Sequence, residues 1–211
     1  MISYKDKLNN MDLLSGLIIL GILVYSAILH EIAHGYVAER LGDPTARLMG
    51  RLTLDIRKHI DPIMSILLPL VLILSGSPII FGAAKPVPID PFNLKEGRKD
   101  VALVSLAGPL TNILIAILAG FLFKIFLIDF FAVVVRLNLL LAIFNLLPIP
   151  PLDGSKVFAL FLPQKTANLY LSLGSIGIFI LFLLLLNPIG GFSLNQFIFS
   201  LLSFSEHLLG L

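Results

Sequence analysis

The apolar run over residues 101–147 constrains the fold more than any other part of the sequence. It carries only three charged side chains, Lys124, Asp129 and Arg136. As a single helix it would be roughly 70 Å long at about 1.5 Å per residue, more than twice the roughly 30 Å hydrocarbon core of a bilayer. The run is therefore predicted to form two membrane-spanning helices, joined by a turn near residues 124–130.

The composition is that of a membrane protein. Of the 211 residues, 57% are hydrophobic and only 13% are charged, whereas soluble domains carry about 25% charged residues. The net charge of +2 is small, which argues against a nucleic-acid partner and leaves the lipid bilayer as the expected environment. Cysteine is absent, which excludes a disulfide framework, a cysteine zinc site and a thiol nucleophile.

Other apolar segments add to these two spans. Residues 12–36 predict a first span and residues 170–186 a fourth. Residues 192–209 predict a weaker fifth, because their polar side chains also suit an interfacial helix. Residues 63–81 are apolar but are interrupted by Pro69 and a Ser-Gly-Ser-Pro sequence.

Together these segments predict an all-α, polytopic membrane protein, a helical bundle of about five transmembrane spans. Residues 63–81 are expected to add a re-entrant hydrophobic hairpin. The alternating polar and apolar residues at 51–56 are expected to add a short β element. We expect one domain over residues 1–211, with its core at 12–160 and C-terminal spans within 168–209.

The first span ends in His-Glu-Ile-Ala-His, residues 30–34. On a helix, His30 and His34 lie one turn apart on one face, a spacing that suits two nitrogens on a single Zn²⁺. Glu31 can then serve as general base toward a water at the metal. A chance match is the alternative, but ionisable residues within a span are costly and are functional by default.

A catalytic zinc needs a third protein ligand. Asp153 is preferred because Pro150 and Pro151 end the preceding helix and Gly154 lets the backbone turn back toward the bundle. An ordinary loop turn is the alternative for this segment. The other candidates for a distant ligand are His59, His207, Asp55, Asp61, Asp90 and Asp129.

Two motifs together resemble the site-2 protease family of intramembrane zinc metalloproteases. They are the histidine motif and the pattern made by Asn145, Pro148, Asp153 and Gly154; the sequence Ala-Gly-Pro-Leu-Thr-Asn at 107–112 is also similar to a family motif. The resemblance implies that His30, His34 and Asp153 bind one Zn²⁺ per chain and that Glu31 is the catalytic base. This chain would be a compact member, because it has no segment long enough for a PDZ or CBS domain.

The resemblance also implies that Asn112 and Asn145 lie at the active-site cavity, where they hold substrate or stabilise an oxyanion. Hydrogen bonding between helices is the alternative for both residues.

The proposed ligands must meet at one depth in the membrane. His30 and His34 lie at the C-terminal end of the first span, and Asp153 lies just past the C-terminal end of its span. Those two helices must therefore run in the same direction, and residues 63–81 cannot be a full crossing. This topology places 11 of the 15 basic residues on one side, which the positive-inside rule assigns to the cytoplasm. We therefore expect a multi-pass protein of the cell membrane, with its active site toward the cytoplasmic side.

The predicted function is hydrolysis of a peptide bond in or near the transmembrane segment of a single-span membrane-protein substrate, as in regulated intramembrane proteolysis. A substrate helix must unwind first, and a strand edge at residues 51–56 or 86–89 could receive the unwound segment by β-augmentation; a purely structural hairpin is the alternative. A membrane zinc transporter or sensor with the same ligands is the rival function. An inactive scaffold is disfavoured because the expected ligands are all present. The oligomeric state is not predicted.

Overall fold

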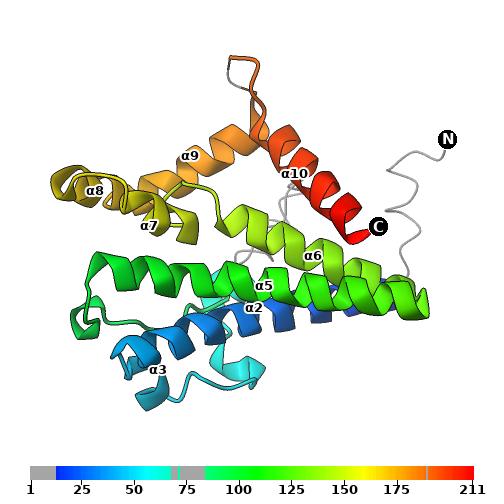
Figure 1. The fold of residues 1–211 in the computed structure, drawn as a ribbon, viewed down its shortest axis with the longest axis horizontal. Helices are drawn as coiled ribbons and strands as arrows, with labels where there is room; N and C mark the ends of the chain where they lie inside the picture. Colours follow the sequence, from blue (N-terminus) through cyan, green and yellow to red (C-terminus); the bar gives the residue numbers. More distant parts are fainter. Residues whose placement is uncertain (1–12, 68–70, 72–83, 189) are drawn as a thin grey trace.

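Three helices side by side form the body of the protein (Figure 1). The structure is a computed structural model that describes residues 13–67, 71, 84–188 and 190–211. The three helices are α2 (Leu13–Leu41), α5 (Arg98–Phe126) and α6 (Asp129–Asn145). The described part of the chain is mostly helical, as predicted.

Two helices among the described residues are long and apolar enough to cross a membrane. They cover Leu14–Leu41 and Arg98–Phe126. The second of them ends close to the start of α6, at Asp129, which confirms the predicted turn near residues 124–130. The chain in α2 and α6 runs in one direction and in α5 in the other (Figure 1), as the shared depth of the proposed ligands requires.

Small side chains bring α5 and α6 together. Ala116 and Ala119 of α5 are buried against Val135 and Leu139 of α6, and Leu202 of a later helix closes the cluster. Without a strong hydrophobic force between helices in lipid, such small residues allow the close backbone approach that packing needs. The cluster therefore holds the two antiparallel helices as one unit.

Short elements gather at the end of the bundle where α2 finishes and α5 begins (Figure 1). They are α3 (Thr45–Leu48), η1 (Ile56–Lys58), η3 (Pro91–Asn93), α7 (Asp153–Ala159) and α8 (Gln164–Leu171), while η2 (Pro62–Leu67) follows η1. His30 and His34 lie in the half of α2 that is nearer this end.

The strand predicted at residues 51–56 is wrong, because this segment is irregular and leads into η1. Asp55 accepts a hydrogen bond from the backbone N–H of Arg57, Thr53 accepts one from the N–H of Asp55, and the ring of His59 donates to the carbonyl of Thr53. These local bonds use backbone groups that a ladder would need. No β-sheet is present in the described ranges.

The predicted fourth span is not one continuous helix. α8 ends at Leu171 and α9 (Gly174–Leu186) begins after a break, with a bend of 71° between Gln164–Leu171 and Ile176–Leu186. The described chain thus has two candidate spans, or three if this bent pair crosses as one. About five spans are not confirmed, and most of the predicted hairpin at 63–81 lies outside the described residues.

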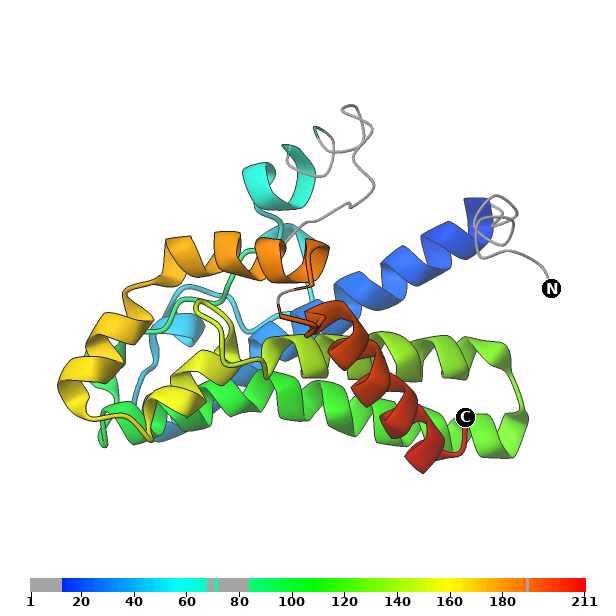
Figure 2. The same cartoon turned by 90° about the horizontal axis from the view of Figure 1, so that it is seen from above.

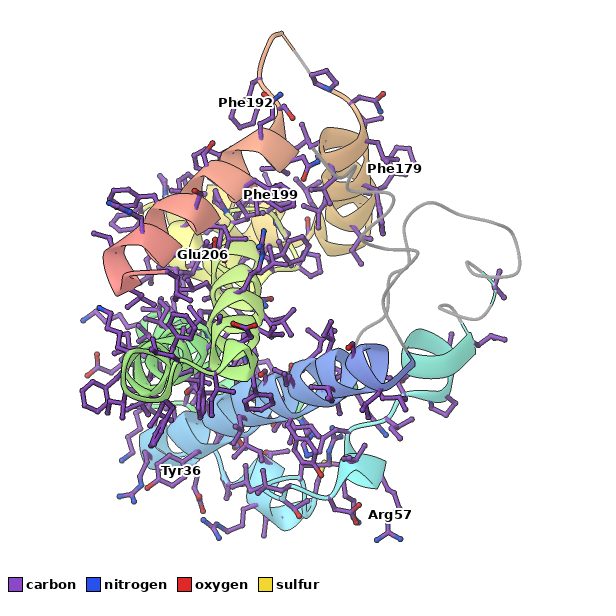
Figure 3. All side chains as sticks on the ribbon, turned by 90° about the vertical axis from the view of Figure 1, so that its right-hand side faces the viewer. Tyr36, Arg57, Phe179, Phe192, Phe199 and Glu206 are labelled. Atoms are coloured by element: carbon purple, nitrogen blue, oxygen red, sulfur yellow. The ribbon has the colours of Figure 1, made fainter. Side chains whose placement is uncertain are left out.

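The C-terminal helix α10 (Leu194–Leu209) packs against both α6 and α9. At about 1.5 Å per residue it is roughly 24 Å long, shorter than the hydrocarbon core. Figure 2 shows α9 and α10 on the same side of the bundle, and Phe179 and Phe192 project outward from this pair in Figure 3. Both phenylalanines are exposed.

Candidate metal centre

The two histidines and Asp153 converge at the end of the bundle, although about 120 residues separate them in sequence (sequence separations of 123 and 119). His30 and His34 lie one turn apart on α2, and Asp153 is the first residue of α7. One carboxylate oxygen, Oδ2 of Asp153, lies 3.1 Å from Nε2 of His30 and 3.1 Å from Nε2 of His34. All three residues are buried, with 6–8% of their surface exposed.

These donors fit Zn²⁺. Zinc bonds of about 2.0–2.1 Å in a tetrahedron place neighbouring ligand atoms roughly 3.3 Å apart, close to the separations seen here. Among the described residues, His30, His34 and Asp153 form the group of histidine and acidic side chains that could hold a metal ion. Their ligand atoms all lie within 4.8 Å of one another. Three protein ligands leave a fourth position for water or substrate, as catalytic zinc sites do.

The absence of a side chain at Gly108 makes room for this site. A Cβ at Gly108 would lie 2.5 Å from Nε2 of both His30 and His34. The helix α5 therefore approaches the two imidazoles so closely that only glycine fits beside them. This gives the small-residue sequence at 107–112 a direct physical role at the site.

Hydrogen bonds to the other ring nitrogens hold both imidazoles in place. Nδ1 of His34 donates to the backbone carbonyl of Val104 at 2.7 Å, and Nδ1 of His30 lies 2.6 Å from Oδ1 of Asn112. With Nδ1 protonated, Nε2 keeps its lone pair for a metal. Both acceptors come from α5, so the contact between α2 and α5 fixes the tautomer of each histidine.

A network of buried polar side chains holds Asn112, the hydrogen-bond partner of His30. The amide nitrogen of Asn112 donates to Oδ1 of Asn138 at 2.9 Å, and the amide nitrogen of Asn138 donates to Oγ of Ser26 at 2.9 Å. Asn112 and Asn138 are fully buried, so this geometry favours the inter-helix role for Asn112 over contact with an oxyanion. Sequence analysis missed Ser26 and Asn138, although a lone asparagine within an apolar span was a usable signal.

Lys156, also missed from the sequence, binds the second carboxylate oxygen of Asp153. Its Nζ lies 3.2 Å from Oδ1, which leaves Oδ2 facing the histidines. Burial raises the pKa of Asp153, whereas the charge of Lys156 lowers it. The ammonium group of Lys156 therefore favours the carboxylate form, which a metal ligand must have.

Glu31 lies between the two histidines in the sequence, and its side chain is half-buried. Its Oε2 accepts a hydrogen bond of 2.8 Å from the backbone N–H of Val87. This bond holds the carboxylate through one oxygen and leaves the other oxygen for a second partner. Asn145 is half-buried and its amide nitrogen donates to the carbonyl of Leu141 in its own helix, so its predicted role in the cavity stays a prediction.

The other candidate ligands do not join this group. Asp55 and Asp90 accept hydrogen bonds from backbone N–H groups at the starts of η1 and η3, and Asp61 accepts one from Ile63. The ring of His59 is bonded to Thr53. Asp129 begins α6, while His207 lies near the end of α10. Among the described residues the structure thus brings Asp153, the preferred candidate, to the histidines.

Comparison with known proteins points to one family. The sequence model of Peptidase family M50 matches residues 122–186. A Bacillus subtilis protein named "Putative zinc metalloprotease YwhC" is 36% identical over 186 residues, which cover 82% of this chain and 81% of that protein. No solved structure matches.

Other relatives carry similar names. The Mycobacterium tuberculosis protein "Putative zinc metalloprotease Rip2" is 37% identical over 145 residues, 65% of this chain and 54% of that protein. The Methanocaldococcus jannaschii protein "Putative zinc metalloprotease MJ0611" is 37% identical over 86 residues, 37% of this chain and 45% of that protein. These names agree with a donor set of two histidines and one aspartate.

Proposed function

The chain belongs to peptidase family M50, the site-2 protease family, and from this premise we propose that it is an intramembrane zinc metalloprotease. It hydrolyses a peptide bond in or near the transmembrane segment of a single-span membrane protein. The observation that carries the proposal is the position of Asp153 Oδ2, 3.1 Å from Nε2 of both histidines, beside a glutamate in the same helical turn. A zinc enzyme needs this combination of three ligands and a base.

The residues of the site prepare the ligands before any substrate arrives. Val104 and Asn112 keep the two Nε2 atoms unprotonated, and Lys156 keeps one oxygen of Asp153 turned toward them. Zn²⁺ held by these residues would supply a Lewis acid, which polarises a carbonyl and makes water more acidic. The ligand positions are thus fixed by second partners, as in other metal enzymes.

Glu31 moves the protons. In the proposed reaction its carboxylate accepts a proton from the attacking water and later delivers it to the nitrogen of the leaving amine. The bond from Val87 restrains Oε2, so we assign the proton transfer to Oε1. The atoms balance: water adds across the C–N bond, which yields one carboxyl and one amino terminus.

We propose a mode of substrate binding that differs from the strand edge predicted from the sequence. Residues 86–89 were candidates for a strand edge, but Pro86 and Pro88 have no backbone N–H and that of Val87 is bonded to Glu31. Since residues 51–56 form no strand either, we propose that the unwound substrate is bound mainly through side chains and exposed backbone carbonyls rather than by a full ladder.

We further propose that the site faces the cytoplasm in a multi-pass arrangement. The basic residues Arg40, Arg47 and Arg57 lie in the last turn of α2, in α3 and in η1, which follow the two histidines along the chain. Because the chain has no cysteine, single cysteines at positions 53 and 93 can be labelled cleanly. Both should react only with a reagent that reaches the cytoplasm, and labelling of position 93 from outside would refute this orientation.

Co-expression with a panel of single-span membrane proteins tests the proposed reaction. Wild type should cut at least one of them within or next to its apolar segment, and Glu31→Gln should cut none. If wild type and Glu31→Gln leave the whole panel equally intact while zinc crosses vesicles that contain the wild type, the rival function of a zinc transporter is the better one.

A further inference from the structure

The segment from Lys85 to Asn93 crosses the end of α2 and contacts Glu31; it is called the strap (residues 85–93). Its sequence is Lys-Pro-Val-Pro-Ile-Asp-Pro-Phe-Asn. Because three of these residues are prolines, the strap has few backbone donors and a restricted backbone. Between residues 86 and 88 the one N–H is that of Val87, and it donates to Oε2 of Glu31 at 2.8 Å.

Buried charged groups anchor the strap at both ends. At the first end, one guanidinium nitrogen of Arg51 donates to the carbonyls of Lys85 and Pro86 at 2.8 and 3.2 Å, and the N–H of Lys85 donates to the carbonyl of His59. Arg51 is 8% exposed. A charged hydrogen bond of this kind is stronger than a neutral one and fixes geometry as well.

Asp43 anchors the other end. Its side chain is fully buried just beyond α2, where Oδ2 accepts the N–H of Asp90 at 2.7 Å and Oδ1 accepts the amide of Asn93 at 3.0 Å. Oδ1 also accepts hydrogen bonds from the backbone N–H and the hydroxyl of Thr45. One carboxylate therefore joins α2, α3 and the strap.

Apolar contacts press the middle of the strap onto α2. Val87 is 5% exposed, and Ile89 packs on the cluster of Ala38 and Val104. Gly35 permits the contact: a Cβ there would lie 2.7 Å from Leu52, 2.8 Å from Val87 and 2.9 Å from Ala46. An alanine at position 35 must therefore push the strap or α3 away from the helix that carries Glu31.

We propose that the strap is a positioning device for the catalytic base, in which the backbone N–H of Val87 orients Glu31 and Asp43, Arg51 and Gly35 hold that N–H in place. This inference rests on the proposed function, because it assigns the base its orientation. None of these four residues touches the reacting atoms, so each acts through Glu31. Oε1 of Glu31, which does not accept the bond from Val87, is thereby directed at the water that it must deprotonate.

Amide hydrogen exchange on the full-length, zinc-loaded protein in detergent tests the contact without any substrate. Because Pro86 and Pro88 have no amide, electron-transfer fragmentation isolates the signal of Val87. Val87 should be protected in wild type and should exchange at least about tenfold faster in Glu31→Ala, Gly35→Ala and Asp43→Asn, since a lost charged hydrogen bond of about 1.5 kcal/mol corresponds to that factor. Gly21→Ala is the matched control, because a Cβ at Gly21 on the same helix meets nothing within 4 Å.

Cleavage kinetics on the same proteins test the consequence. Gly35→Ala should keep the zinc content and KM of wild type while kcat falls about 10- to 100-fold, because a misplaced catalytic group costs on the order of a hundredfold. A merely structural role would lower the amount of folded protein and leave kcat per zinc unchanged. Equal exchange of Val87 in wild type and Glu31→Ala, or an unchanged kcat in a variant whose Val87 is freed, overturns the proposal. Failure of wild type to cleave any substrate would instead refute the protease function, and the exchange result would still decide the Glu31–Val87 contact.

Discussion

Replacement of Gly108 by alanine should destroy the metal site while leaving the fold intact. The added Cβ would lie 2.5 Å from Nε2 of His30 and of His34, against 3.4 Å for an ordinary contact. Each imidazole must therefore retreat by about 0.9 Å, the difference between these values, whereas metal–ligand distances tolerate only about 0.2 Å. α5 cannot move away instead without breaking the hydrogen bonds that the same rings donate to Val104 and Asn112.

The loss should exceed that of a changed outer-shell partner, which costs 10- to 100-fold in metal affinity. We expect Gly108→Ala to bind Zn²⁺ at least about 100-fold more weakly, which corresponds to about 2.8 kcal/mol. The fold should persist, since alanine is favoured over glycine in a helix by about 1 kcal/mol. Competition against graded chelators, with zinc measured by mass spectrometry, gives the affinity.

Gly120→Ala is the matched control on the same helix. A Cβ there meets its nearest atom, in Leu209, at 3.6 Å, which is an ordinary contact. It should therefore bind zinc as wild type does. Zinc affinity of Gly108→Ala within about threefold of wild type would refute the close approach of α5 to the histidines and the assignment of their Nε2 atoms as ligands.

Further predictions follow from groups that support the site. Asn138→Leu removes the 2.9 Å acceptor of the Asn112 amide and leaves it only the 3.5 Å bond to the carbonyl of Ser26, so the protein should lose about 1–3 kcal/mol of stability in thermal unfolding and bind zinc about tenfold more weakly. Arg98→Met removes the hydrogen bonds that Arg98 donates to the carbonyls of Ala159 and Leu162, so a lower Tm is expected, with α7 more open to proteolysis. Burial alone raises the pKa of Asp43, but its hydrogen bonds lower it on balance. The ionised Asp43 therefore stabilises the folded protein fully above the unfolded-state pKa of about 3.9, and this stabilisation is lost as pH falls through the lower pKa of the folded state. Acid unfolding monitored by Val87 exchange should show this loss, and Asp43→Asn should remove that part of the pH dependence.

The parts of the fold that local chemistry decides were predictable from the sequence. The turn between α5 and α6 follows from the charged residues that interrupt an apolar run too long for one span. The meeting of His30, His34 and Asp153 was predicted from the one-turn spacing of the histidines and from the resemblance of the two motifs to the site-2 protease family. The turn thus needs only helix geometry and the thickness of the bilayer, whereas the ligand set needs the resemblance as well.

The parts that depend on contacts between distant segments were not predictable. Ser26 and Asn138 are 112 residues apart, and nothing in either local sequence specifies their rotational register. The strand expected at 51–56 failed because Thr53, Asp55 and His59 offered the backbone local hydrogen bonds in competition with a ladder. The bend after Leu171 shows the same limit, since hydropathy reports burial in lipid but not the continuity of a helix.

Zinc content of the detergent-purified protein tests the central claim most directly, when wild type is measured beside single-residue variants. The account predicts one zinc per chain in wild type and in Glu31→Gln, and a sharp loss in His30→Ala, His34→Ala and Asp153→Ala, because a site of three protein ligands does not survive as two. Full occupancy in Asp153→Ala, or a loss in Glu31→Gln as complete as that in His34→Ala, would contradict it.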